Sequence, residues 1–204
     1  PEILTLAGNS STNWQKEITR KGFTHDAYIA AELKKGKFPM RFSYGNSKTE
    51  GIIRNSELTK NTLSFILTPS FLKDNLLTEL NLFYTDYNEN KVDENAFASA
   101  IFFAPTSPVH EDNSFENYFA WNNEKGIVNQ MQRNPVALIN QLHSNERTSF
   151  LSTSLKLGYK FRKVDGLTSG INVALIHLTQ NQSLVLDTNA AWYTSSWNDV
   201  QLQT

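Results

Sequence analysis

The sequence predicts a mainly β protein, an antiparallel up-and-down meander of about six strands, of the kind that forms the wall of a transmembrane β-barrel. Six segments alternate apolar and polar residues, as strands do because successive side chains point to opposite faces. The connections are alternately short and long, which places the short turns on one rim and the long loops on the other, as in outer-membrane barrels. No apolar run approaches the roughly 20 residues of a spanning helix, whereas a barrel strand needs only about 9–11.

The first two strands are predicted at residues 24–33 and 38–44. The four residues between them, KKGK, fit a tight turn in which Gly36 adopts a positive φ. Pro39 has no backbone N–H, so it is expected near a strand end. A loop of medium length separates this hairpin from the third strand.

The other strands are predicted at residues 60–68, 76–87, 150–161 and 167–178. The turns after the third and fifth strands are too short for a parallel crossover, so each strand should pair with its sequence neighbours. The apolar side chains should face lipid and be exposed where no membrane covers them. The residues predicted to face lipid are Leu63, Phe65, Leu67, Leu80, Leu82, Leu155, Leu157, Ile171, Val173 and Leu175.

The long segment 88–147 is predicted to be an extracellular loop that folds over the barrel mouth. About 60 residues without sustained periodicity are unusual in a compact domain and suggest a functional role. The segment is rich in aromatic residues, among them Phe102 and Phe103, so it should be folded, with a short helical turn near 133–142. Aromatic faces beside amides suit a sugar or peptide ligand or a protein lid, but they also suit clusters that hold loops together. The candidate contact residues are Tyr118, Phe119, Trp121, Asn122, Trp192 and Trp197.

Composition and motifs give no indication of catalysis. The net charge is −1 and no basic stripe is present, which argues against nucleic acid as a partner. There is no cysteine, and the four histidines lack metal-ligand spacing. No nucleophile or phosphate-binding motif occurs, and the scattered carboxylates select no glycosidase pair. No enzyme activity, cofactor or metal is therefore expected. The chain opens at Pro1 rather than at Met, which we interpret as a piece of a longer protein.

Four motifs, in order along nearly the whole chain, resemble the SusC/RagA class of TonB-dependent outer-membrane transporters. Residues 13–18, NWQKEI, are similar to that class's DWQDEI element, with Asn in place of the leading Asp. Residues 50–56, EGIIRNS, follow a strand that ends in Tyr, as in its GIIKNS element. Residues 133–137, RNPVA, and the hairpin that begins at 150–161 match two further elements. The first hairpin turn, KKGK, departs from the usual GGNEK type.

The resemblance implies that residues 1–204 are a partial β-barrel domain, about six consecutive strands of a barrel of about 22. The plug domain, TonB box and signal peptide are expected to lie outside this piece. The resemblance further implies a Gram-negative outer membrane, a SusD-like surface lipoprotein as partner, and TonB as a partner through the plug. The cargo would be oligosaccharides or peptides, imported without covalent chemistry.

Two other readings remain open from the residues alone. In a soluble all-β carbohydrate-binding module, the apolar faces of two sheets would pack against each other in a core. A fragment of a secreted glycosidase is the third reading. Aromatic residues near the predicted strand ends favour the barrel, because they suit the girdles at the membrane interfaces. These residues are Tyr44, Tyr84, Tyr159 and Phe161.

Overall fold

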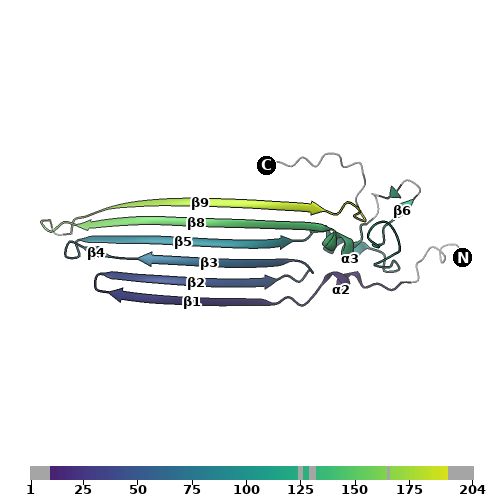
Figure 1. Cartoon of the computed structure of the whole chain (residues 1–204), viewed down its shortest axis with the longest axis horizontal. Coiled ribbons are helices and arrows are strands. Elements are labelled where there is room, and N and C mark those ends of the chain that lie inside the picture. Colours follow the sequence, from purple (N-terminus) through teal and green to yellow (C-terminus); the bar gives the residue numbers. More distant parts are fainter. Residues whose placement is uncertain (1–9, 124–125, 129–131, 165, 193–204) are drawn as a thin grey trace.

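A computed structural model describes residues 10–123, 126–128, 132–164 and 166–192. Its main feature is one seven-stranded antiparallel sheet with the order β1-β2-β3-β5-β8-β9, in which the short strand β4 also pairs with β5 (Figure 1). The predicted meander is therefore confirmed, although the sheet does not close on itself. The strands are β1 (Thr24–Lys35), β2 (Phe38–Glu50), β3 (Glu57–Leu67), β4 (Ser70–Phe71), β5 (Leu76–Lys91), β8 (Leu142–Lys160) and β9 (Thr168–Leu186).

The remaining elements gather at the end of the sheet that bears the long loops (Figure 1). They are the helices α2 (Trp14–Ile18), α3 (Asn95–Phe102) and α4 (Pro135–Asn140), and the short strands β6 (Asn122–Asn123) and β7 (Gly126–Ile127). The helical turn predicted near 133–142 is α4, whereas α2 and α3 were not predicted. None of the helices in the described ranges is long and apolar enough to cross a membrane.

The strands continue further toward the long loops than the sequence predicted. β2 ends at Glu50 rather than 44, β9 ends at Leu186 rather than 178, and β8 begins at Leu142 rather than 150. Because β5 also continues to Lys91, both ends of the segment 88–147 that was predicted as a loop belong to strands. Most residues of these strand ends are polar on both faces, although β9 ends in Leu184, Val185 and Leu186. Hydrophobic periodicity therefore does not detect the strand ends, even though the backbone ladder continues.

The pairing register places all ten residues predicted to face lipid on one side of the sheet, the apolar face. Phe65 lies opposite Leu82, and Leu155 lies between Leu80 and Val173. Leu155, Ile171, Val173 and Leu175 are exposed, and the other six are half-buried by their neighbours in the sheet. Contact with lipid itself stays a prediction.

The long strands of the described chain contain no buried apolar residue. The buried apolar residues all belong to segments at the loop end, such as Trp14, Phe103 and Leu138. The sheet is therefore stabilised by its ladders and cross-strand pairs and not by a core. This arrangement differs from a sandwich, in which a second sheet would bury the apolar face.

The opposite side of the sheet, the polar face, has side chains that hydrogen-bond across the strands. Arg41 Nη1 donates to Glu32 Oε1 at 2.8 Å, and the hydroxyls of Thr62 and Thr85 lie 3.2 Å apart. At the short-turn end, Gly36 has a φ of +61°, as predicted. Pro39 is the second residue of β2, close to the strand end where it was expected.

Candidate functional site

The helices and loops at one end of the sheet form the only apolar cluster of any size in the described chain, which we call the loop module: residues 13–20, 51–56, 92–141 and 187–192 as far as they are described. Trp14 and Ile18 of α2, Phe103 and Leu138 form its buried centre. The Trp14 and Phe103 rings meet edge to face at 4.6 Å, and Trp14 Nε1 donates to the Ala104 carbonyl at 2.9 Å. An indole that is both packed and hydrogen-bonded fixes α2 against the long loop.

The NWQKEI motif forms α2 and anchors the segment after β2. The Asn13 side chain accepts a hydrogen bond from the Lys16 N–H at 3.1 Å and so caps the helix. The Arg20 guanidinium donates to the carbonyls of Gly51 and Ser56 at 3.1 and 2.8 Å. The segment that follows α2 is thereby tied to the EGIIRNS motif.

The EGIIRNS motif needs its glycine and its asparagine for conformational reasons. A Cβ at Gly51 would collide with the Ser56 hydroxyl. Asn55 has a φ of +67°, a left-handed conformation that asparagine tolerates better than most residues. Its amide donates to the Ile139 carbonyl at 2.9 Å, which links this motif to α4.

The RNPVA motif forms the start of α4. The Asn134 side-chain oxygen accepts from the N–H groups of Val136 and Ala137 at 3.0 and 3.4 Å, the geometry of an N-cap. The Asn134 amide donates to the carbonyls of Val109 and Phe119 at 2.9 and 3.1 Å. Three motifs that are distant in sequence thus meet in one module, where their described roles are structural.

Most aromatic candidates hold the loop module together. Phe103 is buried, and Phe119 and Trp121 pack beside it with their rings 5.1 Å apart. The Tyr118 hydroxyl accepts from the Asn140 amide at 3.0 Å, and its ring lies 4.9 Å from that of His110. These contacts fit the alternative in which the aromatic residues hold the loops together. They do not test whether the same residues also contact a ligand.

Two other candidates stand at the module surface. Asn122 is exposed at the start of β6, and Phe102 is 71 % exposed on α3. Trp197 lies outside the described residues.

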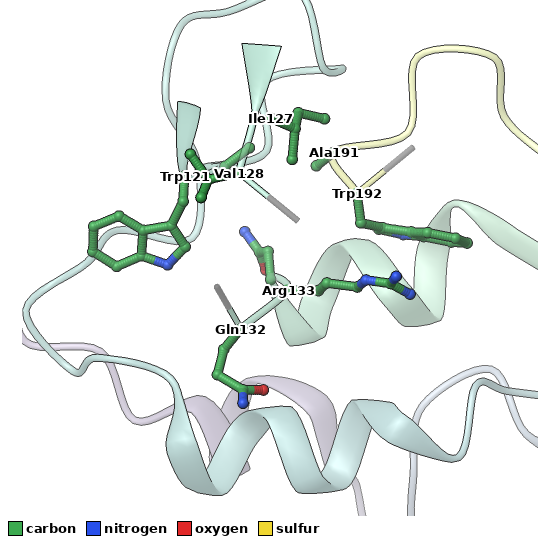
Figure 2. Close-up of a pocket in the computed structure, with 9 residues that line it drawn as sticks. Trp121, Ile127, Val128, Gln132, Arg133, Ala191 and Trp192 are labelled. Atoms are coloured by element: carbon green, nitrogen blue, oxygen red, sulfur yellow. The ribbon is translucent and has the colours of Figure 1, made fainter. Parts of the chain in front are cut away.

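Trp121 and Trp192, 71 positions apart in the chain, border one small pocket together with Gln132 and Arg133 (Figure 2). The Arg133 guanidinium lies 5.3 Å from the centre of the Trp192 ring, a cation–π contact. The pocket has a free volume of about 10 Å³, room for about one water molecule. A pocket of this size cannot hold a sugar ring. Its lining residues instead bring together distant segments of the loop module. The sequence indicated Arg133 only as part of the RNPVA motif, and it gave no indication of Gln132.

Where the loop module meets the polar face, Glu146 of β8 accepts two hydrogen bonds. Lys91 Nζ donates to one carboxylate oxygen at 2.6 Å and Gln180 Nε2 to the other at 2.9 Å. The Lys91 ammonium is the main reason that the pKa of Glu146 lies below its usual value, against an opposing effect of desolvation. The same ion pair raises the pKa of Lys91.

The apolar face is bounded by aromatic rows. Tyr44 and Tyr84 both lie opposite Leu63, so they stand in one row at the loop side. At the other side, the Tyr159 and Phe161 rings meet at 4.9 Å. Between these rows lies the apolar band, which on β5 runs from Leu76 to Tyr84. Its nine residues fit the roughly 9–11 that a tilted membrane strand needs.

Beyond the tyrosine row the same face becomes polar. Arg147 donates to both oxygens of Asp86, at 3.1 and 3.3 Å, and Asn145 donates to Asn88 and Asn90. From β2 to β8 the change from apolar to polar occurs at one level, because Asn46, Asn61, Asp86 and Ser149 form the next row on this face after Tyr84. A girdle followed by polar side chains is typical of an interface between membrane and water.

Comparison with known proteins gives one similarity. No family model matches the chain. Over 106 residues, 52 % of the chain, it is 28 % identical to the TonB-dependent receptor SusC of Bacteroides thetaiotaomicron, and this match covers 11 % of that protein. The chain is therefore similar to a piece of a TonB-dependent receptor and spans only a small part of its length.

Proposed function

We propose that this chain is part of the barrel wall of a TonB-dependent transporter in the outer membrane of a Gram-negative bacterium. The observation that supports this most is the apolar face, which has an aromatic row at each boundary and no packed core behind it. In water such a face would be a large exposed apolar patch, whereas in a bilayer lipid covers it. The similarity to SusC points in the same direction.

The two edges of the sheet support a larger closed barrel. In the described chain β1 pairs only with β2, and the 19-residue strand β9 pairs only with β8. Long edges with unpaired backbone groups invite pairing with further strands. Neighbouring strands of the same polypeptide would satisfy these groups and close the barrel, with about 22 strands if the likeness to SusC extends to the whole protein.

The polar face would then line the barrel lumen, and the loop module would lie at its extracellular mouth. We propose a SusD-like lipoprotein as partner at that mouth, TonB as partner through a plug domain, and oligosaccharides or peptides as cargo. Transport of this kind makes and breaks no covalent bond, so the proposed protein is not an enzyme. These points rest on the similarity to SusC and on the resemblance of the four motifs.

Paired cysteine substitutions in the full-length protein test the orientation of the two faces. Leu175→Cys on the apolar face and Ala174→Cys on the polar face are adjacent residues of β9 and share its exposure to solvent in this structure. In outer-membrane vesicles, a charged water-soluble maleimide should label Ala174→Cys and leave Leu175→Cys unlabelled until detergent is added. Equal labelling of both variants before detergent would contradict the proposal.

A further inference from the structure

The polar face has an exposed aromatic ring that the proposed function does not yet use. Tyr28 of β1 is 66 % exposed although its neighbours on this face are small or polar. It lies opposite Gly45, one residue from the row of Tyr44, which places it at the loop end of the apolar band. In the proposed barrel this position is the lumenal wall just inside the mouth.

The ring lies along the wall instead of projecting from it. Its Cδ2 is 3.7 Å from the place that a Cβ on Gly45 would occupy, so the ring rests close to the backbone of β2. Its hydroxyl accepts a hydrogen bond from Arg41 Nη2 at 3.1 Å, and Arg41 is in turn paired with Glu32 at 2.8 Å. Ser43, which lies between Gly45 and Arg41 on this face, is buried. The ring is therefore held beside β2 by these contacts, while most of the residue stays exposed.

Polar groups lie beside the ring on the same face of the sheet. Asp26, Ser47 and Lys60 form the adjacent row of the register, with the carboxylate and the ammonium on strands about 10 Å apart. Within the described chain, neither Asp26 nor Lys60 takes part in an ion pair. Together with Tyr28 and Thr62 they line a hollow of about 370 Å³, within the size range of small-molecule sites.

We propose that Tyr28 is a stacking platform for one ring of a neutral oligosaccharide at the lumenal mouth, with Asp26 accepting from and Lys60 donating to its hydroxyls. A sugar ring has an apolar C–H face that gains by covering an aromatic ring, and its edges need hydrogen-bonding groups. The small residues of β2 leave room for it. An apolar peptide side chain would need an apolar pocket, which this hydroxyl- and charge-lined hollow lacks.

A further strand beside β1 would cover the flank of Tyr28 but not its face, because neighbouring strands lie in the plane of the sheet. The site therefore persists in a closed barrel. The inference rests on the proposed function, since only a barrel makes the polar face a lumen. It narrows the cargo from oligosaccharides or peptides to the first of these.

The test uses the full-length protein, purified in detergent, with maltohexaose, xylohexaose and mannohexaose as probes in calorimetric titrations. At least one of the three should bind, and Tyr28→Ala should weaken it about five- to tenfold. Tyr28→Phe keeps the ring and should stay within about threefold of wild type. The matched control is Tyr44→Ala, a tyrosine removed from the apolar face, which should bind like wild type.

Binding of none of the three sugars, or unchanged binding by Tyr28→Ala, would overturn the inference. It would also be overturned if Tyr28→Ala left sugar binding intact but made the plug domain more accessible to protease, since Tyr28 would then be a plug contact. Heat-modifiable migration and outer-membrane fractionation of each variant test the barrel separately. A failed titration with an intact barrel therefore rejects the sugar site and leaves the proposed function standing.

Discussion

In the proposed barrel, an arginine at Leu155 should be more destabilising than an arginine at any other position of the apolar face of β8. On the apolar face of β8, the band runs through five alternate positions from Leu151 to Tyr159, and Leu155 is the middle one. Leu157, the next residue of this face toward Tyr159, lies one step nearer the boundary. A charged side chain at the bilayer midplane costs about 2–4 kcal/mol, and the cost falls toward about 0–1 kcal/mol near the interfaces.

The assay is guanidinium unfolding of the full-length protein refolded into phospholipid vesicles, compared with the matched variant Ser154→Arg on the polar face. Leu155→Arg should lower the free energy of unfolding by about 2–4 kcal/mol and Leu157→Arg by less. Ser154→Arg should stay within about 0.5 kcal/mol of wild type, because the polar face would border an aqueous lumen in the proposed barrel. Equal losses for Leu155→Arg and Ser154→Arg would refute the assignment of the two faces.

Three further predictions concern the loop module. Asn134→Ala removes an N-cap and the amide donor of the Phe119 carbonyl, whereas the Val109 carbonyl still accepts from the Phe119 N–H. It should therefore destabilise the module by about 2–4 kcal/mol, measured as faster limited proteolysis of the loop, while the exposed control Asn122→Ala should not. Glu146→Gln should increase proteolysis at pH 7 but not near pH 3. The pKa of Glu146 is lowered on folding, so the carboxylate stabilises the folded state at pH values above its unfolded pKa. This stabilisation disappears as the pH falls through the folded pKa. A difference that persists at pH 3 would contradict this. Trp121→Ala combined with Tyr118→Ala should reduce cargo uptake and co-purification of the lipoprotein; wild-type values for both, with the barrel assembled, would leave these rings a purely structural role.

The apolar part of the fold was predictable because its periodicity is strong. Every predicted strand exists, and the ten predicted lipid-facing residues share one face, since alternation in sequence becomes a face in any strand. The polar extensions were not predictable by this signal. In Asn88 and Arg147 and their neighbours both faces are polar, and their pairing follows from the ladder that continues from the apolar band.

The loop module was predictable only in outline. Its aromatic content predicted that it would fold, but α3 was missed. Glu94, the residue before α3, makes no side-chain cap bond, and the Asp93 carboxylate accepts instead from the Asn95 N–H at 2.8 Å. The contacts of Trp14 with Phe103 and of Trp192 with Arg133 join residues that are far apart in the chain and that no local pattern relates. The platform at Tyr28 was equally hidden, because its exposure depends on Gly45 and Arg41 of the neighbouring strand.

The loop module also explains how a sheet without a core can keep its loop end in register. Gln141, between α4 and β8, is buried, and its side-chain oxygen accepts from the Ala191 N–H at 2.8 Å beyond the end of β9. On the other side, Asn55 ties the β2–β3 connection to α4. One packed unit therefore holds both the β2–β3 and the β8–β9 pairs. No core between the strands stabilises the sheet. This connection therefore keeps the strands together in the part of the sheet that would extend beyond the membrane.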